Sequence, residues 1–388
     1  MIFTKHLVES CRPYRTPFLL IDKSIVRHKY AAIAGSLDGL EVFYAMKANP
    51  HPEVLRVLAE AGCGFEVSSL PELEQVVALG VPATRVISSN PVKSPDFLRR
   101  ATAVRVDTYA FDSPAELEKI ASEAPGSKVY IRLAVDNTGS DWPLSKKYGV
   151  DSSEAPDLLA YARDLRLVPY GVTFHVGSQC LNKNNWVNAL FIASEIWKAS
   201  ARRGIKLQML SLGGGLPIQH TKPTPTIKEI AEAIETALRT LFTERPRLNI
   251  EPGRALVGDA GVLVATVIGK AQRGLENWLY LDAGVFNALM ETIQGFQYEL
   301  RTEHTGALKL FTVAGPSCDS VDVMFQKVLL PDVAVGDRVY IMNAGAYTLS
   351  YASSFNGFSP PEAHVVDDAA TSMAASQPAK PEAKQRSS

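Results

Sequence analysis

A lysine at the end of an apolar run is the first residue in this chain that could do covalent chemistry. Lys47 follows the strand-like segment 41–45 and precedes Asn49 and Pro50, with no charged residue beside it. A solvated lysine is protonated and cannot attack a carbonyl, whereas one held among apolar groups can have its pKa lowered enough to form a Schiff base. Lys47 is therefore a candidate for covalent attachment of a carbonyl-bearing cofactor, although a solvated strand end would show the same pattern.

Four other features supply what a phosphorylated aromatic cofactor requires. The glycines at 213–215 let backbone N–H groups approach a phosphate without obstruction by side chains. Arg254 can add a charge-assisted contact to that phosphate, and Glu251 can hydrogen-bond a protonated pyridine nitrogen, which keeps the ring able to accept electrons. His175 offers a flat ring for stacking. Together with Lys47, these residues predict pyridoxal 5'-phosphate (PLP) as the cofactor.

Each of these residues also has an ordinary structural interpretation. His175 could be a core histidine, the glycines at 213–215 could form a plain turn, and Glu251 with Arg254 could be a surface ion pair. Their position argues for a site, because each follows a predicted strand. In a parallel barrel the carboxyl ends of the strands converge on one face, where the chemistry gathers.

The elements that must position these residues alternate between apolar strands and amphipathic helices. Strands are predicted at residues 41–45, 65–67, 85–89, 105–109, 128–134, 169–175, 207–212 and 247–251. Helices are predicted at residues 52–61, 70–79, 114–123, 155–165, 184–203 and 226–242. About eight such alternations are typical of a parallel (β/α)8 barrel, and an open doubly wound sheet is the competing architecture.

The pattern of the sequence changes after Gly253. Valine-rich alternating segments at 261–268, 278–281, 309–313, 322–330 and 333–341 predict a mainly antiparallel β domain. Residues 369–388 carry almost no large apolar side chains and are expected to form a disordered tail. The predicted division is an N-terminal segment at 1–21 that joins the β domain, a barrel at 22–255, and the β domain at 256–368.

Composition narrows the function classes. The chain has 388 residues, of which 46% are hydrophobic and 21% charged, which suits a globular protein with two cores. A net charge of −1 gives no long-range attraction to nucleic acid or to an anionic membrane. Without a long apolar run, the expected location is the cytoplasm. Four scattered cysteines suggest neither a disulfide framework nor a metal site.

Six motifs occur in an order that is specific to one family. They are Tyr-Ala-Met-Lys-Ala-Asn at 44–49, Phe-His-Val-Gly-Ser-Gln at 174–179, three glycines at 213–215, Glu-Pro-Gly-Arg at 251–254, Cys-Asp at 318–319 and Asn-Ala-Gly-Ala-Tyr at 343–347. This arrangement resembles the fold type III PLP enzymes of the ornithine, lysine and diaminopimelate decarboxylase family. The resemblance implies an alanine racemase-like PLP-binding barrel followed by a β domain, and a PLP-dependent amino-acid decarboxylase.

The resemblance also implies roles for individual residues. Lys47 would carry PLP as a Schiff base, His175 would stack on the ring, and Glu251 would pair with the pyridinium nitrogen. Ser178, the glycine loop, Arg254 and Tyr347 would hold the phosphate. The complete set of cofactor-binding residues implied in this way is Lys47, Glu66, Arg132, His175, Ser178, Gly213, Gly214, Gly215, Glu251, Arg254 and Tyr347.

In the family, part of each active site comes from the neighbouring subunit of a homodimer. Cys318 and Asp319 would be supplied in this way, so that each site would need two chains. Asp319 would help to hold the distal amine of the substrate, and Phe355 would contact the substrate. Cys318 would donate a proton after CO2 leaves, which places it with Lys47, His175 and Glu251 among the catalytic residues.

The subfamily motifs favour a basic substrate. The segments 315–320 and 354–358 resemble ornithine and lysine decarboxylases, which implies a diamine product such as putrescine or cadaverine and a role in polyamine biosynthesis. Asp319 suits a cationic distal group. Gly295, however, stands where eukaryotic-type ornithine decarboxylases have an aspartate. Either Asp319 suffices, Glu291 substitutes, or the substrate is diaminopimelate, arginine or a specialised biosynthetic precursor.

Two relatives of other classes also resemble parts of this chain. Regulatory homologues keep the fold but bind proteins, and they usually lose parts of the PLP site, whereas Lys47, His175, Glu251, Arg254 and Cys318 are all present here. Racemases share the barrel but lack the motifs at 318–319 and 355–358. A catalytic decarboxylase is therefore the expectation.

Overall fold

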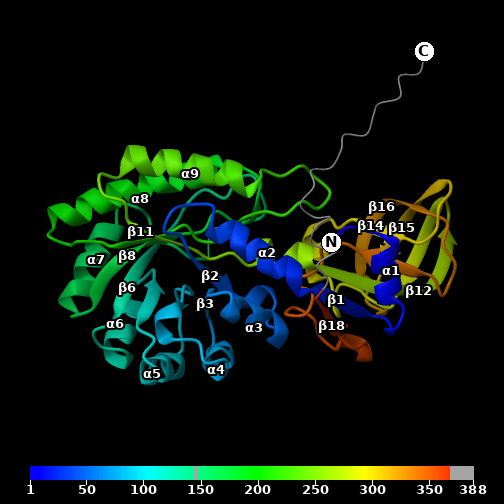
Figure 1. The fold of residues 1–388 in the computed structure, drawn as a ribbon, viewed down its shortest axis with the longest axis horizontal. Coiled ribbons are helices and arrows are strands. Elements are labelled where there is room, and N and C mark those ends of the chain that lie inside the picture. Colours follow the sequence, from blue (N-terminus) through cyan, green and yellow to red (C-terminus); the bar gives the residue numbers. More distant parts are fainter. Residues whose placement is uncertain (144–146, 368–388) are drawn as a thin grey trace, which may run out of the picture.

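Two structural units lie side by side in the molecule. The structure is a computed structural model and describes residues 1–143 and 147–367, so the predicted tail at 369–388 falls outside the described residues. A barrel surrounded by helices forms one end of the long axis, and a sheet domain forms the other (Figure 1). The N-terminus lies close to the point where the two units meet.

The first unit is a parallel barrel, as predicted. Its strands are β2 (Glu41–Ala45), β3 (Gly64–Glu66), β4 (Val86–Ile87), β5 (Thr108–Phe111), β6 (Lys128–Leu133), β8 (Val168–Phe174), β10 (Met209–Ser211) and β11 (Arg247–Ile250). They pair in the order β4-β3-β2-β11-β10-β8-β6-β5. A parallel bridge between Ser88 and Tyr109 joins the two ends of this order. The ring is therefore nearly closed, and the competing open doubly wound sheet is wrong.

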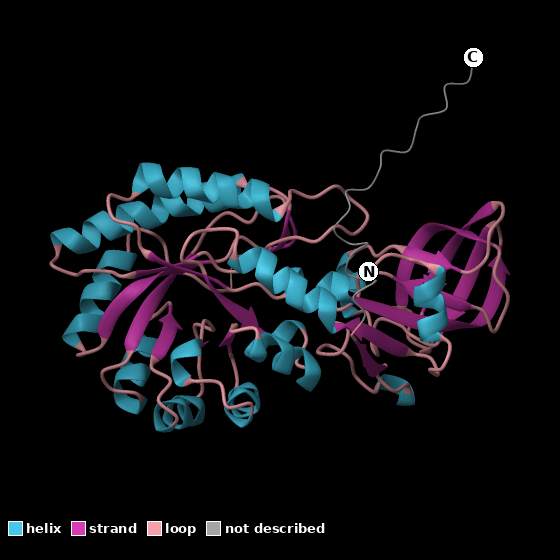
Figure 2. Ribbon diagram, viewed as in Figure 1, coloured by secondary structure: helices cyan, strands magenta, loops and turns pink. Residues whose placement is uncertain are grey.

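Helices cover the outside of the barrel (Figure 2). They are α2 (Lys23–Ala34), α3 (Pro52–Glu60), α4 (Leu70–Ala78), α5 (Pro95–Ala103), α6 (Pro114–Glu123), α7 (Ala155–Asp164), α8 (Asn184–Arg202), α9 (Ile227–Leu241) and the short α10 (Arg254–Val257). Ser69, Ser94 and Ser113 cap three of them with a side-chain oxygen, and a proline occupies the first turn each time. These signals fix where the helices begin.

Strand boundaries differ most from prediction around β4 and β5. The predicted strand at 85–89 is reduced to two residues, and the one at 105–109 starts only at Thr108. Arg105 has a φ of 67°, which is incompatible with a strand and ends the turn that follows α5. Helix α2 was not predicted at all, because its hydrophobic face is short and its charged residues dominate the local pattern.

The second unit is a mainly antiparallel sheet built from both ends of the chain. Its strands are β1 (Phe18–Asp22), β12 (Gly261–Arg273), β13 (Glu276–Leu281), β14 (Leu300–Thr302), β15 (Leu308–Ala314), β16 (Val323–Pro331), β17 (Arg338–Ile341) and β18 (Glu362–Val366). Strand β1 pairs antiparallel with β12 and parallel with β18. Within the segment 333–341 the strand begins at Arg338, because Gly336 turns the chain with a φ of 99°, as the glycine and aspartate at 336–337 predict.

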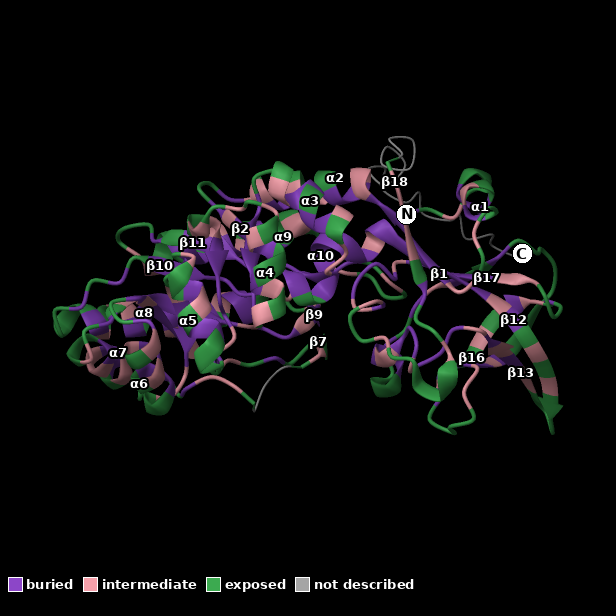
Figure 3. Ribbon diagram, turned by 90° about the horizontal axis from the view of Figure 1, so that it is seen from below, coloured by how far each residue is buried: buried purple, intermediate pink, exposed green. Residues whose placement is uncertain are grey.

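The core runs through both units, with buried residues along the barrel strands and the inner face of the sheet (Figure 3). Two polar contacts join the units beside the end of β2. The Asn49 side chain donates to the Gly345 carbonyl at 2.8 Å, and the Tyr347 N–H donates to the Ala48 carbonyl at 2.7 Å. The segment 343–347 of the sheet domain therefore reaches the mouth of the barrel.

Candidate active site

A cavity of about 430 Å³ opens at the carboxyl ends of the barrel strands. Most of the residues predicted to bind a cofactor line it: Lys47, Glu66, Arg132, His175, Ser178, Gly214, Gly215, Glu251, Arg254 and Tyr347. They come from segments up to 300 residues apart in sequence. The barrel topology brings most of them together, and the segment 343–347 of the sheet domain adds Tyr347.

Lys47 lies in the single 3-10 turn, Met46–Ala48, that follows β2. Its side chain is exposed to the cavity, while Met46 and Ala48 on either side are buried. Burial by the surrounding protein favours the neutral amine, but the charges of Tyr347 and Glu66 favour the ammonium, and the pKa lies above its ordinary value. The expectation that apolar surroundings lower the pKa of Lys47 is therefore wrong for the cofactor-free site.

Two buried carboxylates, Glu66 and Glu251, face the same cavity. Glu66 accepts hydrogen bonds from the Ser68 hydroxyl at 3.1 Å and the Ser89 N–H at 3.2 Å. Glu251 accepts one from the Ser211 hydroxyl at 2.6 Å. Burial and the charge of Glu66 raise the pKa of Glu251 to about 7. A cationic group between these carboxylates would satisfy both, which suits a pyridinium nitrogen.

His175 follows β8 and is neutral. Burial, together with the charges of Arg132 and Lys47, lowers its pKa well below the ordinary range. Its Nδ1 accepts a hydrogen bond from the Gly177 N–H at 3.0 Å, so the proton of the neutral ring is on Nε2. The ring therefore has a fixed orientation and tautomer, as stacking on an aromatic cofactor requires.

The glycines at 213–215 are required for packing as well as for access to a phosphate. A Cβ on Gly213 would lie 1.9 Å from the Phe174 carbonyl, and one on Gly215 would lie 2.4 Å from the Gly177 carbonyl. A Cβ on Gly214 would lie 2.9 Å from Nε2 of His175. The loop therefore lies directly against the chain that carries His175, and any larger residue would displace the ring.

Arg254 presents unpaired donors to the cavity. Its Nη2 forms a buried ion pair with Glu291 at 2.5 Å, and the Tyr298 hydroxyl donates to the other oxygen of Glu291 at 3.1 Å. Among the described residues, neither Nε nor Nη1 of Arg254 has a hydrogen-bond partner, although both are buried. Because unpaired buried donors are costly, these two N–H groups fit an anion such as a phosphate.

Cys318, Asp319 and Phe355 lie elsewhere, on the surface of the sheet domain. Cys318 and Asp319 are exposed in the loop between β15 and β16, and Phe355 is 43% exposed. The Cys318 N–H donates to the Asn356 side chain at 3.1 Å, and Phe355 packs on Phe286 with ring centroids 4.5 Å apart. The chain thus gathers these residues together but does not bring them to its own cavity.

Several residues of the cavity were not singled out in the sequence. Ser89 lines it, and its hydroxyl lies 2.5 Å from that of the buried Tyr130. Tyr148 also lines it and lies 5.5 Å from the guanidinium of Arg132. The signal that could have found Ser89 is its position as the last residue of the predicted strand at 85–89, next to Asn90. Tyr148 follows a loop whose path the sequence pattern does not define.

Comparison with known proteins identifies the family. Residues 23–258 match the model of the pyridoxal-binding domain of the pyridoxal-dependent decarboxylases. The chain belongs to this family. A lysine/ornithine decarboxylase of Selenomonas ruminantium is 37% identical over 88% of each chain. PLP is therefore the cofactor of this decarboxylase. The donors of Arg254 fit its phosphate, and the carboxylates of Glu66 and Glu251 fit its protonated ring nitrogen.

Solved structures agree with the family assignment. A lysine decarboxylase from Selenomonas ruminantium superposes with a TM-score of 0.88 at 34% identity, covering 97% of this chain and 99% of that one. A lysine/ornithine decarboxylase from Vibrio vulnificus, complexed with putrescine, has a TM-score of 0.86 at 32% identity, covering 94% and 99%. The decarboxylase fold therefore extends over both units of the chain.

Two other kinds of feature, membrane-spanning helices and metal sites, are absent from the residues that the structure describes. Within residues 1–143 and 147–367, no helix combines the length and the apolar character needed to cross a membrane. The same residues contain no group of three or more histidine, cysteine, aspartate or glutamate side chains arranged to hold a metal ion.

Proposed function

We propose that this decarboxylase acts on a basic L-amino acid, ornithine or lysine or both, and releases CO2 and a diamine such as putrescine or cadaverine in polyamine biosynthesis. The observation that carries the proposal is the pairing of a complete cofactor cavity with 37% identity to a lysine/ornithine decarboxylase over most of the chain. The relative at 33% identity from Caenorhabditis elegans is an ornithine decarboxylase, which favours the same substrate class.

The chain's own residues divide the work at the cofactor. Lys47 would hold the cofactor covalently, and His175 would stack on its ring. Arg254, with the loop at 213–215, holds the phosphate. PLP, when bound, withdraws electrons from the bond between the substrate Cα and its carboxylate. Glu251 keeps the ring nitrogen protonated, and this preorganised charge is expected to supply much of the rate enhancement.

We infer that the active unit is a homodimer with shared sites. Cys318, Asp319 and Phe355 lie together on the surface, outside the cavity of their own chain, so a second chain has to present them. Leu308, Leu310 and Leu329 are each more than half exposed, and Leu310 lies opposite Leu329 on β15 and β16. An exposed apolar surface on the β-hairpin that also carries the Cys318 loop suits an interface.

The distal group of the substrate is assigned to Asp319 of the second chain. Glu291, which could have substituted for the expected aspartate, is held by Arg254 and Tyr298 and does not line the cavity. Gly295 ends the 3-10 turn Met290–Gln294 with a φ of 83° and does not line the cavity either. Neither residue can recognise the distal amine in this arrangement.

Other amino acids remain the alternative within the same chemistry. Diaminopimelate, arginine or a specialised precursor would use the same cofactor cavity and differ only at the distal end. A regulatory protein that does not catalyse is less favoured, because Lys47, Glu251 and Arg254 are present and their side chains converge on one cavity.

We further propose that the chain divides functionally at the positions predicted from the sequence, with the barrel at 22–255 and the sheet domain at 256–368. Residues 1–21 belong with the sheet domain. The pairing of β1 with β12 and β18, and the family match at 23–258, support this division.

The test is CO2 release by the PLP-loaded protein from L-ornithine, L-lysine, L-arginine and meso-diaminopimelate, with diamine formation measured in parallel. Lys47→Ala is the control and is expected to lose turnover completely. Turnover of ornithine or lysine supports the proposal. Turnover of diaminopimelate or arginine alone would overturn the substrate assignment, and CO2 release by Lys47→Ala that requires PLP would overturn the role of Lys47.

A further inference from the structure

The barrel is held together least tightly at the seam between β4 and β5, beside the cofactor cavity. Among the described residues, the single bridge between Ser88 and Tyr109 joins the two sides. It consists of hydrogen bonds from the Ser88 N–H to the Thr108 carbonyl at 3.1 Å and from the Ala110 N–H to the Ser88 carbonyl at 2.8 Å. Beyond this bridge, the segment 89–93 has no strand partner in the barrel order.

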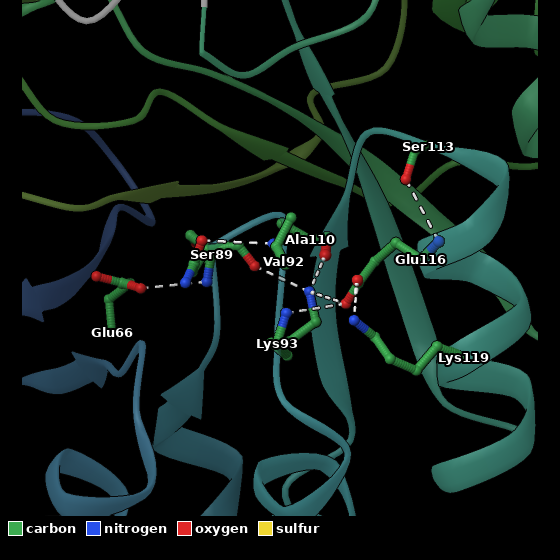
Figure 4. A network of polar contacts seen from close by, with 9 residues as sticks. Glu66, Ser89, Val92, Lys93, Ala110, Ser113, Glu116 and Lys119 are labelled. Carbon is green, nitrogen blue, oxygen red and sulfur yellow. Dashed lines mark hydrogen bonds and ion pairs between the residues drawn. The ribbon is translucent and has the colours of Figure 1, made fainter.

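A fully buried lysine spans the seam at this point. Lys93 Nζ donates to the Asn90 carbonyl at 2.8 Å and to the Ala110 carbonyl at 2.5 Å, so the ammonium connects one side of the seam to the other. It also pairs with Glu116 of helix α6 at 3.1 Å (Figure 4). Three acceptors match the three protons of an ammonium, so Lys93 has no proton left for a ligand.

The side chain of Glu116 also binds the backbone of this loop. Its Oε1 accepts from the Lys93 N–H at 3.2 Å, and its Oε2 pairs with Lys119 at 2.5 Å from the side of the helix (Figure 4). In the part of the chain that the structure describes, Lys119 of α6 pairs with Glu116 and makes no hydrogen bond or ion pair with the loop at 89–93. Both lysines therefore pair with the Glu116 carboxylate, but of the two only Lys93 also binds backbone carbonyls on both sides of the seam.

The loop that Lys93 secures carries groups that reach the cofactor site. Ser89, Asn90 and Pro91 line the cavity. The Ser89 N–H donates to Glu66 at 3.2 Å, as Figure 4 shows, and the Ser89 hydroxyl contacts Tyr130 at 2.5 Å. Asn90, whose carbonyl Lys93 binds, is the residue next to Ser89. A shift of the loop would therefore move a donor away from a carboxylate of the cofactor site.

A buried ammonium is a costly way to close a seam if stability is the only purpose. Burial lowers the pKa of Lys93 to about 8 against the opposing effect of Glu116, so the group is still mostly charged at neutral pH. Buried ion pairs are often no more stabilising than apolar side chains of similar volume. What an apolar side chain cannot do is bind two carbonyl groups and hold them at a fixed separation.

We propose that Lys93 is a positioning residue for the cofactor site: its ammonium holds the loop at 89–91 across the β4–β5 seam, and thereby fixes the Ser89 N–H on Glu66 beside the cofactor ring. The inference rests on the roles proposed above for Glu66 and Glu251. Lys93 itself touches neither cofactor nor substrate.

The test compares Lys93→Met with Lys119→Met, which removes a charge from the same carboxylate without touching the loop. The PLP dissociation constant, the pH dependence of the visible absorbance of bound PLP, and the melting temperature are measured for each. For Lys93→Met, the dissociation constant is expected to rise about tenfold, as loss of a buried charged hydrogen bond would produce, and the absorbance transition is expected to shift in pH. Lys119→Met is expected to stay within about twofold of wild type.

A charge-balanced variant separates positioning from stability. Lys93→Met/Glu116→Gln removes the buried carboxylate whose Oε1 loses its ammonium partner in Lys93→Met, although Oε2 keeps Lys119. The double variant carries the test if the single variant does not fold. Weak PLP binding with a recovered melting temperature supports the proposal. Wild-type PLP affinity and an unchanged absorbance transition in either Lys93 variant, whatever the melting temperature, would overturn it. Glu251→Gln separates a failure of the proposed function from a failure of the proposal for Lys93. If Glu251→Gln leaves activity unaffected, the role proposed for Glu251 is contradicted, but the contact of Lys93 across the seam is not.

Discussion

The cofactor half and the substrate half of this site are built differently. Lys47, Glu251 and Arg254 converge on one cavity from within a single barrel, and buried partners from the same chain orient Glu251 and Arg254. Cys318 and Asp319 lie in an exposed loop of the sheet domain, where the Cys318 N–H donates to the Asn356 side chain and Asp319 accepts from the Val321 N–H. One chain therefore holds the cofactor cavity by itself, whereas in the proposed homodimer a second chain would complete the substrate site.

This difference separates two kinds of preorganisation. Side chains held in a barrel have their geometry fixed by folding, before any ligand arrives. Side chains on an exposed loop gain their geometry only when a partner surface packs against them. Affinity for PLP and turnover of substrate should therefore respond to different perturbations, and the following experiments test that separation.

The largest effect is expected from mixing two inactive variants. Lys47→Ala lacks the cofactor attachment and Cys318→Ala lacks the proposed proton donor, so each alone should form little diamine. If sites are shared in a homodimer, random exchange of subunits restores about one quarter of the sites. Recovery of about that fraction of wild-type diamine formation is the expected result, measured after the two proteins are mixed and allowed to re-equilibrate.

The control for the mixing experiment is Lys47→Ala mixed with a second variant of the cofactor half, Arg254→Met. Each barrel of the heterodimer then carries one of the two changes, so neither site has an intact cofactor half and no recovery of diamine formation is expected. Cys318→Ala and Asp319→Ala, which both change the loop, should likewise complement Lys47→Ala but not each other. Recovery from the Cys318→Ala and Asp319→Ala pair would contradict a loop supplied as one unit.

Loss of the charge beside the ring nitrogen is expected to be the next largest effect. Glu251→Gln keeps the shape of the side chain and the contact to Ser211 but cannot hold the nitrogen protonated. The expected fall in kcat is about 10²- to 10³-fold, as for other preorganised electrostatic groups. Steady-state kinetics at saturating substrate measure this effect, and a protein that loses only PLP affinity would show that Glu251 binds rather than activates the cofactor.

The cofactor-free protein should lose stability as the pH rises. Glu251 has a pKa of about 7 in the folded state against about 4.5 when unfolded, so between these values the folded state binds one more proton than the unfolded state. The free energy of unfolding should fall by up to about 3 kcal/mol from pH 4.5 to 7. Glu251→Gln should remove this component, which denaturant titrations of both proteins at several pH values would measure.

A smaller effect is expected from changing Glu291, the ion-pair partner of Arg254. Glu291→Gln keeps a hydrogen-bond acceptor for Arg254 and Tyr298 but removes the buried charge that fixes the guanidinium. The PLP dissociation constant is expected to rise about tenfold. The KM for substrate, measured at saturating PLP, should change little. A large rise in KM for ornithine or lysine instead would assign Glu291 to the distal amine.

Much of the barrel could be predicted from the sequence, because its strands are continuous apolar runs and its helices have strong caps. The cavity residues at strand ends, such as His175 and Glu251, followed from that prediction. The seam between β4 and β5 did not, since Lys93 has no local feature that distinguishes it from a solvated lysine. The raised pKa of Lys47 was also missed, because Tyr347 lies 300 residues away in sequence.

The contacts of Ala48 and Asn49 with Tyr347 and Gly345 restrict how this protein could be engineered. The turn that carries Lys47 is hydrogen-bonded on its far side by the sheet domain, at 2.7 and 2.8 Å. The barrel is therefore not a transplantable module, although it contains most of the cofactor cavity. A chimera that replaces the sheet domain has to keep the contacts of the segment 343–347 with residues 48 and 49. Without them, the turn that carries Lys47 is expected to lose its orientation.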